Sequence, residues 1–232
     1  DGRALKAGAG RAAVQKRVHA GAQHLYPPGG QAVQHAQALP RAVAAHGRAA
    51  ELDVARGQHG ASVPGQALYI LRLALGRTLA MKLETTARMQ PCKLTEAFHN
   101  YFAVGNLTKC RVHGLDDVPF REEAAQPMKH GERPLAPLGC LDRVYDCPAC
   151  SGKIVLEDFV LNRTITVERD HASSVIIWNP GQQGAGNMAD LGAESWNKFL
   201  CVEMGNAGSR CIPLASGQSH TLCQKITVGP LE

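Results

Sequence analysis

The first 66 residues lack most of the side chains that build a β-sheet or a hydrophobic core. They contain no Ile, Phe, Trp, Met, Thr, Asn or Cys, and Tyr26 is their one aromatic residue, whereas 17 positions are Ala and 10 are Gly. A segment with so few branched and aromatic side chains can bury little apolar surface. We therefore expect residues 1–66 to contribute almost no strand and treat them as an atypical N-terminal segment.

Acidic side chains are also scarce in this segment. Eight Lys or Arg face three acidic residues there, so the segment carries the whole net charge of +5, and the remaining 17 bases and 17 acids balance. Three explanations stay open: a basic tail that binds nucleic acid, an organelle transit peptide, and translation of GC-rich DNA in a wrong frame. We favour the third, because the charges are scattered and Ser62 is the only serine. Residues 1–66 would then be a mistranslated or incomplete N-terminal part of the sandwich.

Long apolar runs are absent from the sequence as well. No run approaches the roughly 18–20 residues that span a bilayer, and a hydrophobic share of 44% is typical of a globular protein. We therefore expect a cytoplasmic protein that binds neither membrane nor nucleic acid. Leu231-Glu232 resembles a vector-derived end and is set aside.

From residue 67 onward, short alternating segments predict strands. Apolar residues alternate through 69–75 and again through 79–83, with Gly76-Arg77 between them, which predicts a hairpin with one buried face. Further expected strands are 109–113, 153–156, 164–168, 175–178, 199–203 and 221–228, and residues 188–198 favour a short helix or a turn of helix. Many short strands separated by turns predict an all-β sandwich or barrel, in one domain over residues 67–230.

The eight cysteines all follow residue 91, and one pair has a spacing with chemical meaning. Cys147 and Cys150 form a C-x-x-C motif, which is half of a zinc site, but no second pair at a suitable spacing follows. A thioredoxin-like redox motif would need a helix N-terminus at the first cysteine, and Ser151-Gly152-Lys153 leads into a strand instead. We therefore expect reduced loop cysteines and no metal.

Two ionisable residues lie in apolar surroundings. His99 is embedded among aromatic residues in 98–102, and Glu203 ends the apolar segment 199–203. By themselves these patterns favour an ordinary hydrogen-bonded histidine and a carboxylate that faces water. A buried Glu203 would instead have a raised pKa and would suit a general base.

A resemblance to a known family bears on this choice. Five motifs occur in the order and at roughly the spacing seen in glucose-6-phosphate 1-epimerases of the aldose 1-epimerase (galactose mutarotase) superfamily. They are LTEAFHNYFAVG at 94–105, RVHGLD at 111–116, LDRVY at 141–145, WNP at 178–180 and FLCVE at 199–203. The resemblance covers residues 67–230 and implies a galactose mutarotase-like β-sandwich, called a supersandwich, with its cleft on one concave sheet.

The same resemblance implies an activity and its residues. Opening the hemiacetal ring of a sugar needs a base at the anomeric hydroxyl and an acid at the ring oxygen, and it needs no cofactor. The family pattern gives Glu203 the role of base, His99 that of acid, and Asp142 that of holding sugar hydroxyls. Tyr101 and Trp178 are candidates for lining the cleft. We expect a hexose 6-phosphate or a related aldose as the partner, and a monomer or a weak dimer.

The resemblance fails at the front of the chain. Family members carry an upstream HGFAR motif and further arginines that hold the phosphate, whereas the nearest string here is His46-Gly47-Arg48, which lacks the Phe. The phosphate preference is therefore an expectation from the family and does not come from residues of this sequence. A non-catalytic carbohydrate-binding protein of the same fold is the alternative.

Overall fold

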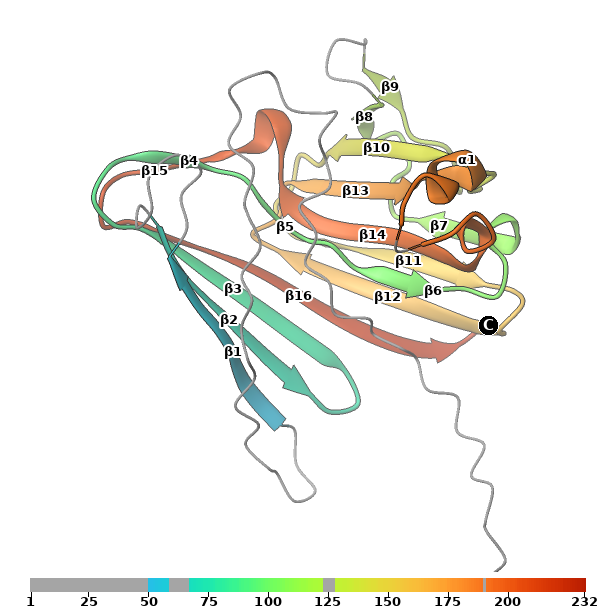
Figure 1. Cartoon of the computed structure of the whole chain (residues 1–232), viewed down its shortest axis with the longest axis horizontal. Helices are drawn as coiled ribbons and strands as arrows, with labels where there is room; N and C mark the ends of the chain where they lie inside the picture. Colours follow the sequence, from blue (N-terminus) through green and yellow to red (C-terminus); the bar gives the residue numbers. More distant parts are fainter. Residues whose placement is uncertain (1–49, 59–66, 123–127, 190) are drawn as a thin grey trace, which may run out of the picture.

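The computed structural model of the chain describes residues 50–58, 67–122, 128–189 and 191–232. The expectations for residues 1–49, the string at His46 among them, lie outside the described residues. The described part of the chain consists mainly of antiparallel strands in two stacked sheets (Figure 1).

The first sheet has seven strands in the described residues, and each neighbouring pair is antiparallel. It is the larger layer in Figure 1 and runs from β1 at one edge to β7 at the other. In spatial order its strands are β1 (Ala50–Gln58), β2 (Ala67–Leu75), β3 (Leu79–Ala87), β16 (Ser219–Pro230), β12 (Arg163–Asp170), β11 (Gly152–Asp158) and β7 (Cys110–His113).

The second sheet is built around β14, which pairs with β13 on one side and with both β5 and β6 on the other. Its strands in spatial order are β5 (Glu96–Phe98) with β6 (Tyr101–Ala103), then β14 (Phe199–Asn206), β13 (Ser174–Asn179), β10 (Leu141–Asp146), β8 (Pro119–Arg121) and β9 (Lys129–His130).

A few short elements complete the described chain. β4 (Cys92–Leu94) and β15 (Ile212–Leu214) form a separate two-stranded ribbon. The described helical turns are α1 (Gly181–Gly186), η1 (Leu107–Lys109), η2 (Trp196–Lys198) and η3 (Gly208–Arg210). None of the described helices combines the length and the apolar character that crossing a membrane requires.

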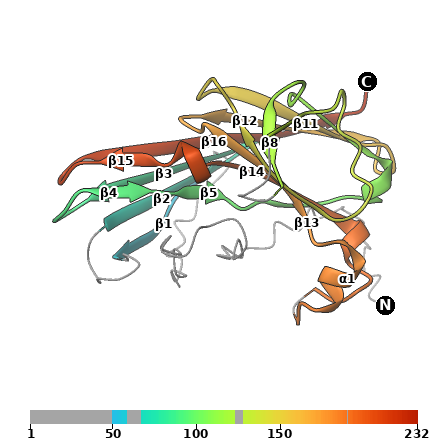
Figure 2. The same ribbon diagram turned by 90° about the horizontal axis from the view of Figure 1, so that it is seen from above.

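The two sheets stack face to face, and the core lies between them. Figure 2 shows β11, β12 and β16 in one layer and β13 and β14 in the other. Alternate side chains of each strand point into this space, as two packed antiparallel sheets require. The buried side chains from the central strands are Ile154, Leu156, Ile165, Val167, Val175, Ile177, Leu200, Val202, Met204 and Leu222. The opposite faces of the two sheets therefore form the outside of the sandwich.

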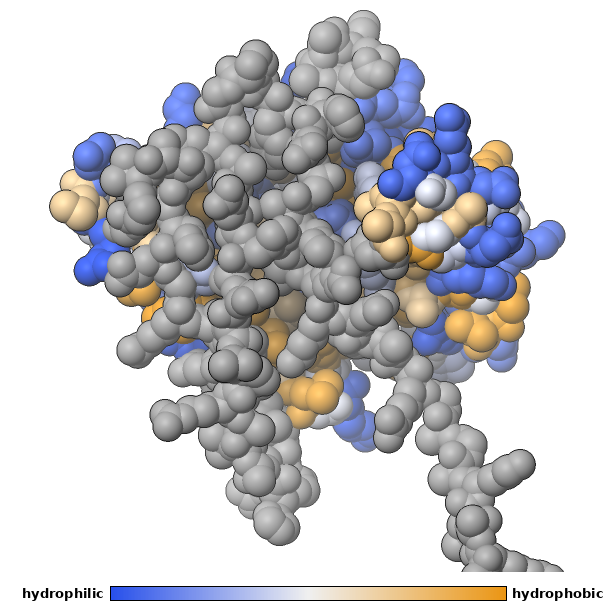
Figure 3. All heavy atoms as spheres, in the orientation of Figure 1, coloured by the Kyte–Doolittle hydropathy of each residue, from blue (hydrophilic) through white to orange (hydrophobic). Residues whose placement is uncertain are grey.

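Three exposed apolar side chains of the described surface lie together at one turn. The turn between β11 and β12 exposes Phe159, Val160 and Leu161, each by about half. In Figure 3 the apolar atoms at this end of the sandwich lie among hydrophilic ones. Apolar residues at a tight turn are ordinary on a protein surface.

The expected all-β sandwich is confirmed. The predicted hairpin is β2 and β3, which pair from Ala67–Ala87 to Leu75–Leu79 around a tight turn. The inward-facing residues of this hairpin include Leu71, Met81 and Leu83, which pack against the core. The other expected strands coincide with β7, β11, β12, β13, β14 and β16.

Within residues 188–198, expected as a short helix or a turn of helix, the described residues contain only the helical turn η2, and α1 ends before them at Gly186. Gly192 has a φ of 78°, which a right-handed helix cannot contain, so the helical turn stays short. The expectation for the N-terminal segment is wrong in one respect. Strand β1 lies at 50–58, inside the segment expected to contribute almost no strand. Backbone pairing with β2 forms an edge strand without requiring large side chains.

Candidate functional site

The register of the second sheet places four of its residues in one row. Asp142 pairs with Trp178, Trp178 pairs with Cys201, and Cys201 pairs with Tyr101. Directly opposed residues of antiparallel strands project to the same face of a sheet. Because Leu200 and Val202 point into the core, this row lies on the outer face of the second sheet.

His99 and Glu203 lie in the next row of the same face. β5 and β6 pair with β14 in one continuous register, since Met204 is opposite Phe98 and Cys201 is opposite Tyr101. This register puts His99 opposite Glu203, at the two-residue gap between β5 and β6. The structure therefore brings all five site residues expected from the sequence to neighbouring positions on one face.

The acid–base candidates are in contact. Nδ1 of His99 lies 3.1 Å from Oε1 of Glu203, and the two side chains are only 15% and 8% exposed. Neither residue is close to the other in sequence, so the sheet alone produces this contact. A histidine and a carboxylate at this distance can exchange a proton or share one between them.

Aromatic rings fix the position of the imidazole. The His99 ring stacks on Tyr101, with 4.8 Å between ring centroids and 4° between planes. The Trp178 ring is nearly perpendicular to both, with its centroid 5.9 Å from that of His99 and 6.1 Å from that of Tyr101. Phe199 supports Tyr101 from the other side at 5.3 Å. Large flat rings of this kind also offer a surface on which the C–H face of a sugar could lie.

Electrostatics raise the proton affinity of the carboxylate. Burial raises the pKa of Glu203 well above the usual range of a glutamate, and the negative charge of Asp142 raises it further. A carboxylate with a raised pKa is a stronger base than an exposed glutamate, which suits a general base. The Cys201 thiol is affected in the same way: burial raises its pKa, and the charge of Glu203 adds to the effect.

Two residues of this region were missed by the sequence interpretation. Cys201 lies two positions before Glu203 on the same strand, so the period of two places both on one face, and the motif FLCVE contains this signal. Asn100 donates a hydrogen bond of 3.0 Å from Nδ2 to the backbone oxygen of Val202, where a ladder bond would otherwise lie. No pattern in the sequence indicated this contact.

The C-x-x-C motif is not part of the site. All eight cysteines are free thiols; Cys147 is buried and Cys150 is exposed. Strand β10 precedes the motif, and β11 follows it at Gly152, so the helix of a thioredoxin-like site does not follow this pair. Among the described residues, the one group of three potential metal ligands is His99, Cys201 and Glu203.

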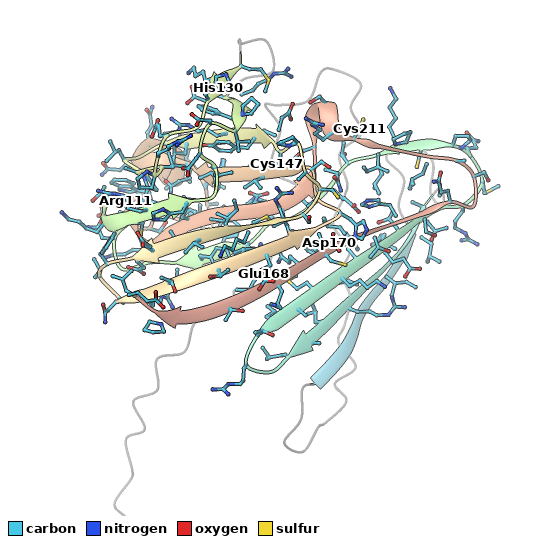
Figure 4. The ribbon with its side chains drawn as sticks, turned by 180° about the vertical axis from the view of Figure 1, so that it is seen from behind. Arg111, His130, Cys147, Glu168, Asp170 and Cys211 are labelled. Carbon is cyan, nitrogen blue, oxygen red and sulfur yellow. The ribbon has the colours of Figure 1, made fainter. Side chains whose placement is uncertain are left out.

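A hollow lies on the opposite side of the sandwich from these residues. It has a volume of about 380 Å³ on the outer face of the first sheet, where Arg72 and Lys82 meet Glu168, Asp170 and Lys225. Figure 4 shows this face, with Glu168 and Asp170 on β12. Opposite charges pair within it, as between Lys225 and Glu168 at 2.8 Å. Because these opposite charges neutralise one another, the outer face of the second sheet remains the better candidate for the functional site.

Comparison with known proteins identifies the family. The family model described as aldose 1-epimerase matches residues 37–227. Two curated relatives, from Salmonella typhimurium and Escherichia coli, are named "Putative glucose-6-phosphate 1-epimerase" and are 33% and 32% identical over 143 residues. Each match covers 60% of this chain and 46% of the relative, so the match spans less than half the length of these proteins.

Solved structures agree in fold. The crystal structure of a "putative mutarotase" from Salmonella typhimurium superposes with a TM-score of 0.70 at 26% identity, covering 83% of this chain and 65% of that one. An aldose epimerase homologue from C. elegans superposes with a TM-score of 0.63 at 10% identity, covering 83% and 69%, and at this identity it supports the fold alone. The family match extends over most of the chain, from before β1 into β16, and the chain belongs to the aldose 1-epimerase family.

Proposed function

We propose that this protein is an isomerase that interconverts the α and β anomers of a hexose 6-phosphate by acid–base ring opening, without a cofactor. The observation that carries the proposal is the buried contact between His99 and Glu203. The anomeric hydroxyl oxygen and the ring oxygen of a pyranose are both bonded to C1. The groups that serve these two oxygens must therefore lie within a few ångström of each other, as His99 and Glu203 do.

The reaction runs through an open chain. The Glu203 carboxylate takes the proton of the anomeric hydroxyl while protonated His99 gives a proton to the ring oxygen. The C1–O5 bond breaks, its electrons leave with O5, and an aldehyde forms at C1. Rotation about C1–C2 exposes the other face of the carbonyl. The ring then closes as His99 takes back the proton of the 5-hydroxyl and Glu203 returns its proton to the carbonyl oxygen.

The raised pKa of Glu203 suits both halves of this cycle. Burial and the charge of Asp142 make the carboxylate a stronger base than an exposed glutamate. The same shift lets Glu203 hold the proton until ring closure. A non-catalytic carbohydrate-binding protein would gain nothing from burying an ionisable glutamate against a histidine, because such a group costs stability.

The remaining residues of the face would hold the sugar. Asp142 lies in the row beside Glu203 and offers carboxylate oxygens to sugar hydroxyls. Tyr101 and Trp178 meet edge to face and would contact the apolar face of the ring. The 6-phosphate is supported by the names of the relatives and not by a described cationic group, so it is the more specific part of the proposal.

Exchange NMR tests the proposal, because it measures the rate at which α and β anomers interconvert at equilibrium. We expect the protein to accelerate exchange of glucose 6-phosphate and to act more weakly on glucose and galactose. Equal acceleration of glucose and glucose 6-phosphate would remove phosphate recognition and leave the mutarotase proposal. Exchange of all three sugars at the uncatalysed rate would contradict the proposal as a whole.

A further inference from the structure

The site carries a third chemical group that the ring-opening reaction does not use. Ligand atoms of His99, Cys201 and Glu203 all lie within 4.8 Å of one another. Together they offer an imidazole nitrogen, a thiol sulfur and a carboxylate oxygen. We propose that these three residues bind a thiophilic divalent ion such as Zn²⁺, and that the bound ion inhibits the enzyme.

The geometry is close to that of a tetrahedral site. Zinc bonds of about 2.0–2.3 Å place the ligand atoms about 3.3–3.8 Å apart. The separation between Nδ1 of His99 and Oε1 of Glu203 is already 3.1 Å. The largest separation in the group, 4.8 Å at most, requires a side-chain shift of about 1 Å.

The strands hold the ligands in place. Cys201 and Glu203 are alternate residues of β14, a strand paired on both sides, and both are buried. The His99 ring is fixed by its stacking on Tyr101. A cluster on paired strands loses little conformational freedom when an ion binds, and this favours binding.

The donor set selects the kind of ion. A thiolate and an imidazole favour Zn²⁺ and similar ions, whereas Mg²⁺ and Ca²⁺ prefer oxygen ligands. A dication would also relieve the cost of ionising the buried thiol and carboxylate, since burial raises the pKa of both Cys201 and Glu203. Binding releases the thiol proton to solvent, so affinity for the ion should fall as the pH is lowered.

Such an ion would act as an inhibitor and not as a cofactor. It would occupy the nitrogen and the oxygen that exchange protons with the sugar in the proposed mechanism. Metal and sugar would therefore compete for the same atoms. Cys201 would give the enzyme a sensitivity to zinc that a mutarotase without this thiol would lack.

Cobalt is the best probe of this site, because Co²⁺ replaces Zn²⁺ and a sulfur ligand gives it a near-ultraviolet charge-transfer band. Titration of the metal-free protein should produce this band at one equivalent of Co²⁺. Cys201→Ala should abolish the band. Cys110→Ala is the matched control, because Cys110 is another fully buried strand cysteine, and it should leave the band unchanged.

Inhibition is measured in parallel, relative to the metal-free rate of each variant. Zn²⁺ should inhibit the unmodified protein and the Cys110→Ala variant equally, whereas Mg²⁺ should not inhibit either. The Zn²⁺ concentration for half inhibition should rise by at least about tenfold in Cys201→Ala, which loses the soft ligand. If Cys201→Ala does not fold, as judged by circular dichroism, Cys201→Ser is used in its place.

The two readouts separate the two proposals. A cobalt band that persists in the Cys201 variant, or zinc inhibition that does not depend on Cys201, would overturn the metal site. A protein that anomerises no sugar but shows the Cys201-dependent band would refute the proposed function and leave the metal site standing.

Discussion

Asn100 and Gln224 exchange two amide hydrogen bonds, each 3.0 Å long, across the space between the two sheets. Asn100 follows His99 in the gap between β5 and β6, and its Nδ2 also donates to the backbone oxygen of Val202. Gln224 is buried in β16 of the first sheet. The pair therefore connects the backbone next to the imidazole to the opposite layer of the sandwich.

Loss of this connection should move His99 and weaken catalysis. We expect Asn100→Ala to lower kcat for anomerisation by about tenfold with a smaller change in KM, because Asn100 does not touch the sugar. The variant should also lose about 1–3 kcal/mol of unfolding free energy, since Oε1 of the buried Gln224 is left without the donor that Asn100 supplies. Gln224→Ala should have the same effect on kcat, and the double variant should be no slower than either single one. Additive losses in kcat would show that the amide pair does not position His99.

Asp142 should raise the pH at which the enzyme becomes active. Its negative charge is the second cause of the raised pKa of Glu203. In Asp142→Asn that contribution disappears, so the acid limb of the kcat/KM profile should move to lower pH. The readout is the pH at which the acid limb falls. The maximal kcat/KM is not used, because it also decreases when Asp142 no longer contacts sugar hydroxyls. A limb that stays in place would remove Asp142 from the electrostatics of the base.

Glu203 should limit the stability of the fold. Its folded-state pKa is raised above the value in the unfolded chain, so the folded state binds more protons between those two values. The unfolding free energy therefore falls as the pH rises through that window. Glu203→Gln removes this dependence and should melt at a higher temperature than the unmodified protein at neutral pH, with a smaller difference in acid. Equal melting temperatures at both pH values would contradict the burial of an ionisable group.

Chelators and reductants should leave the protein intact. All eight cysteines are free thiols, so dithiothreitol should not change the melting temperature. EDTA should not lower the anomerisation rate, because the proposed steps use only His99 and Glu203. A rise in rate with EDTA would indicate that the purified protein carries an inhibitory ion. A loss of activity in EDTA would contradict a cofactor-independent mechanism.

The sequence predicted the fold well where the alternation of side chains is regular. The hairpin of β2 and β3 was predicted from the period-two alternation of its apolar residues. In β12 the buried residues Ile165 and Val167 alternate with partly exposed ones, as the period of two predicts. It failed at β1, an edge strand that backbone pairing with β2 forms without large side chains. Residues 188–198 were expected as a short helix or a turn of helix, and with a positive φ at Gly192 only the turn η2 forms.

The candidate site residues could be named from motifs that resemble the family, but their contacts could not. His99 and Glu203 are more than a hundred positions apart, and only the shared register of β5 and β6 on β14 makes them neighbours. The role of Asn100 depends on Gln224 in the other sheet, so no local pattern indicates it. Cys201 was within reach of the sequence, because it shares the face of Glu203 by period two.

The central claim is that His99 and Glu203 act together as acid and base. Its most direct test is the anomer exchange rate of glucose 6-phosphate by NMR in Glu203→Gln and His99→Asn. The chain supplies a matched control: His113 and Glu157 form a second histidine–glutamate pair, 2.8 Å apart, on the first sheet. Glu157→Gln and His113→Asn remove this other pair.

We expect each site variant to lose about two to four orders of magnitude in rate, the usual contribution of a general acid or base, while both control variants keep the full rate. A rate close to that of the unmodified protein in Glu203→Gln or His99→Asn, with the fold intact, would contradict the mechanism.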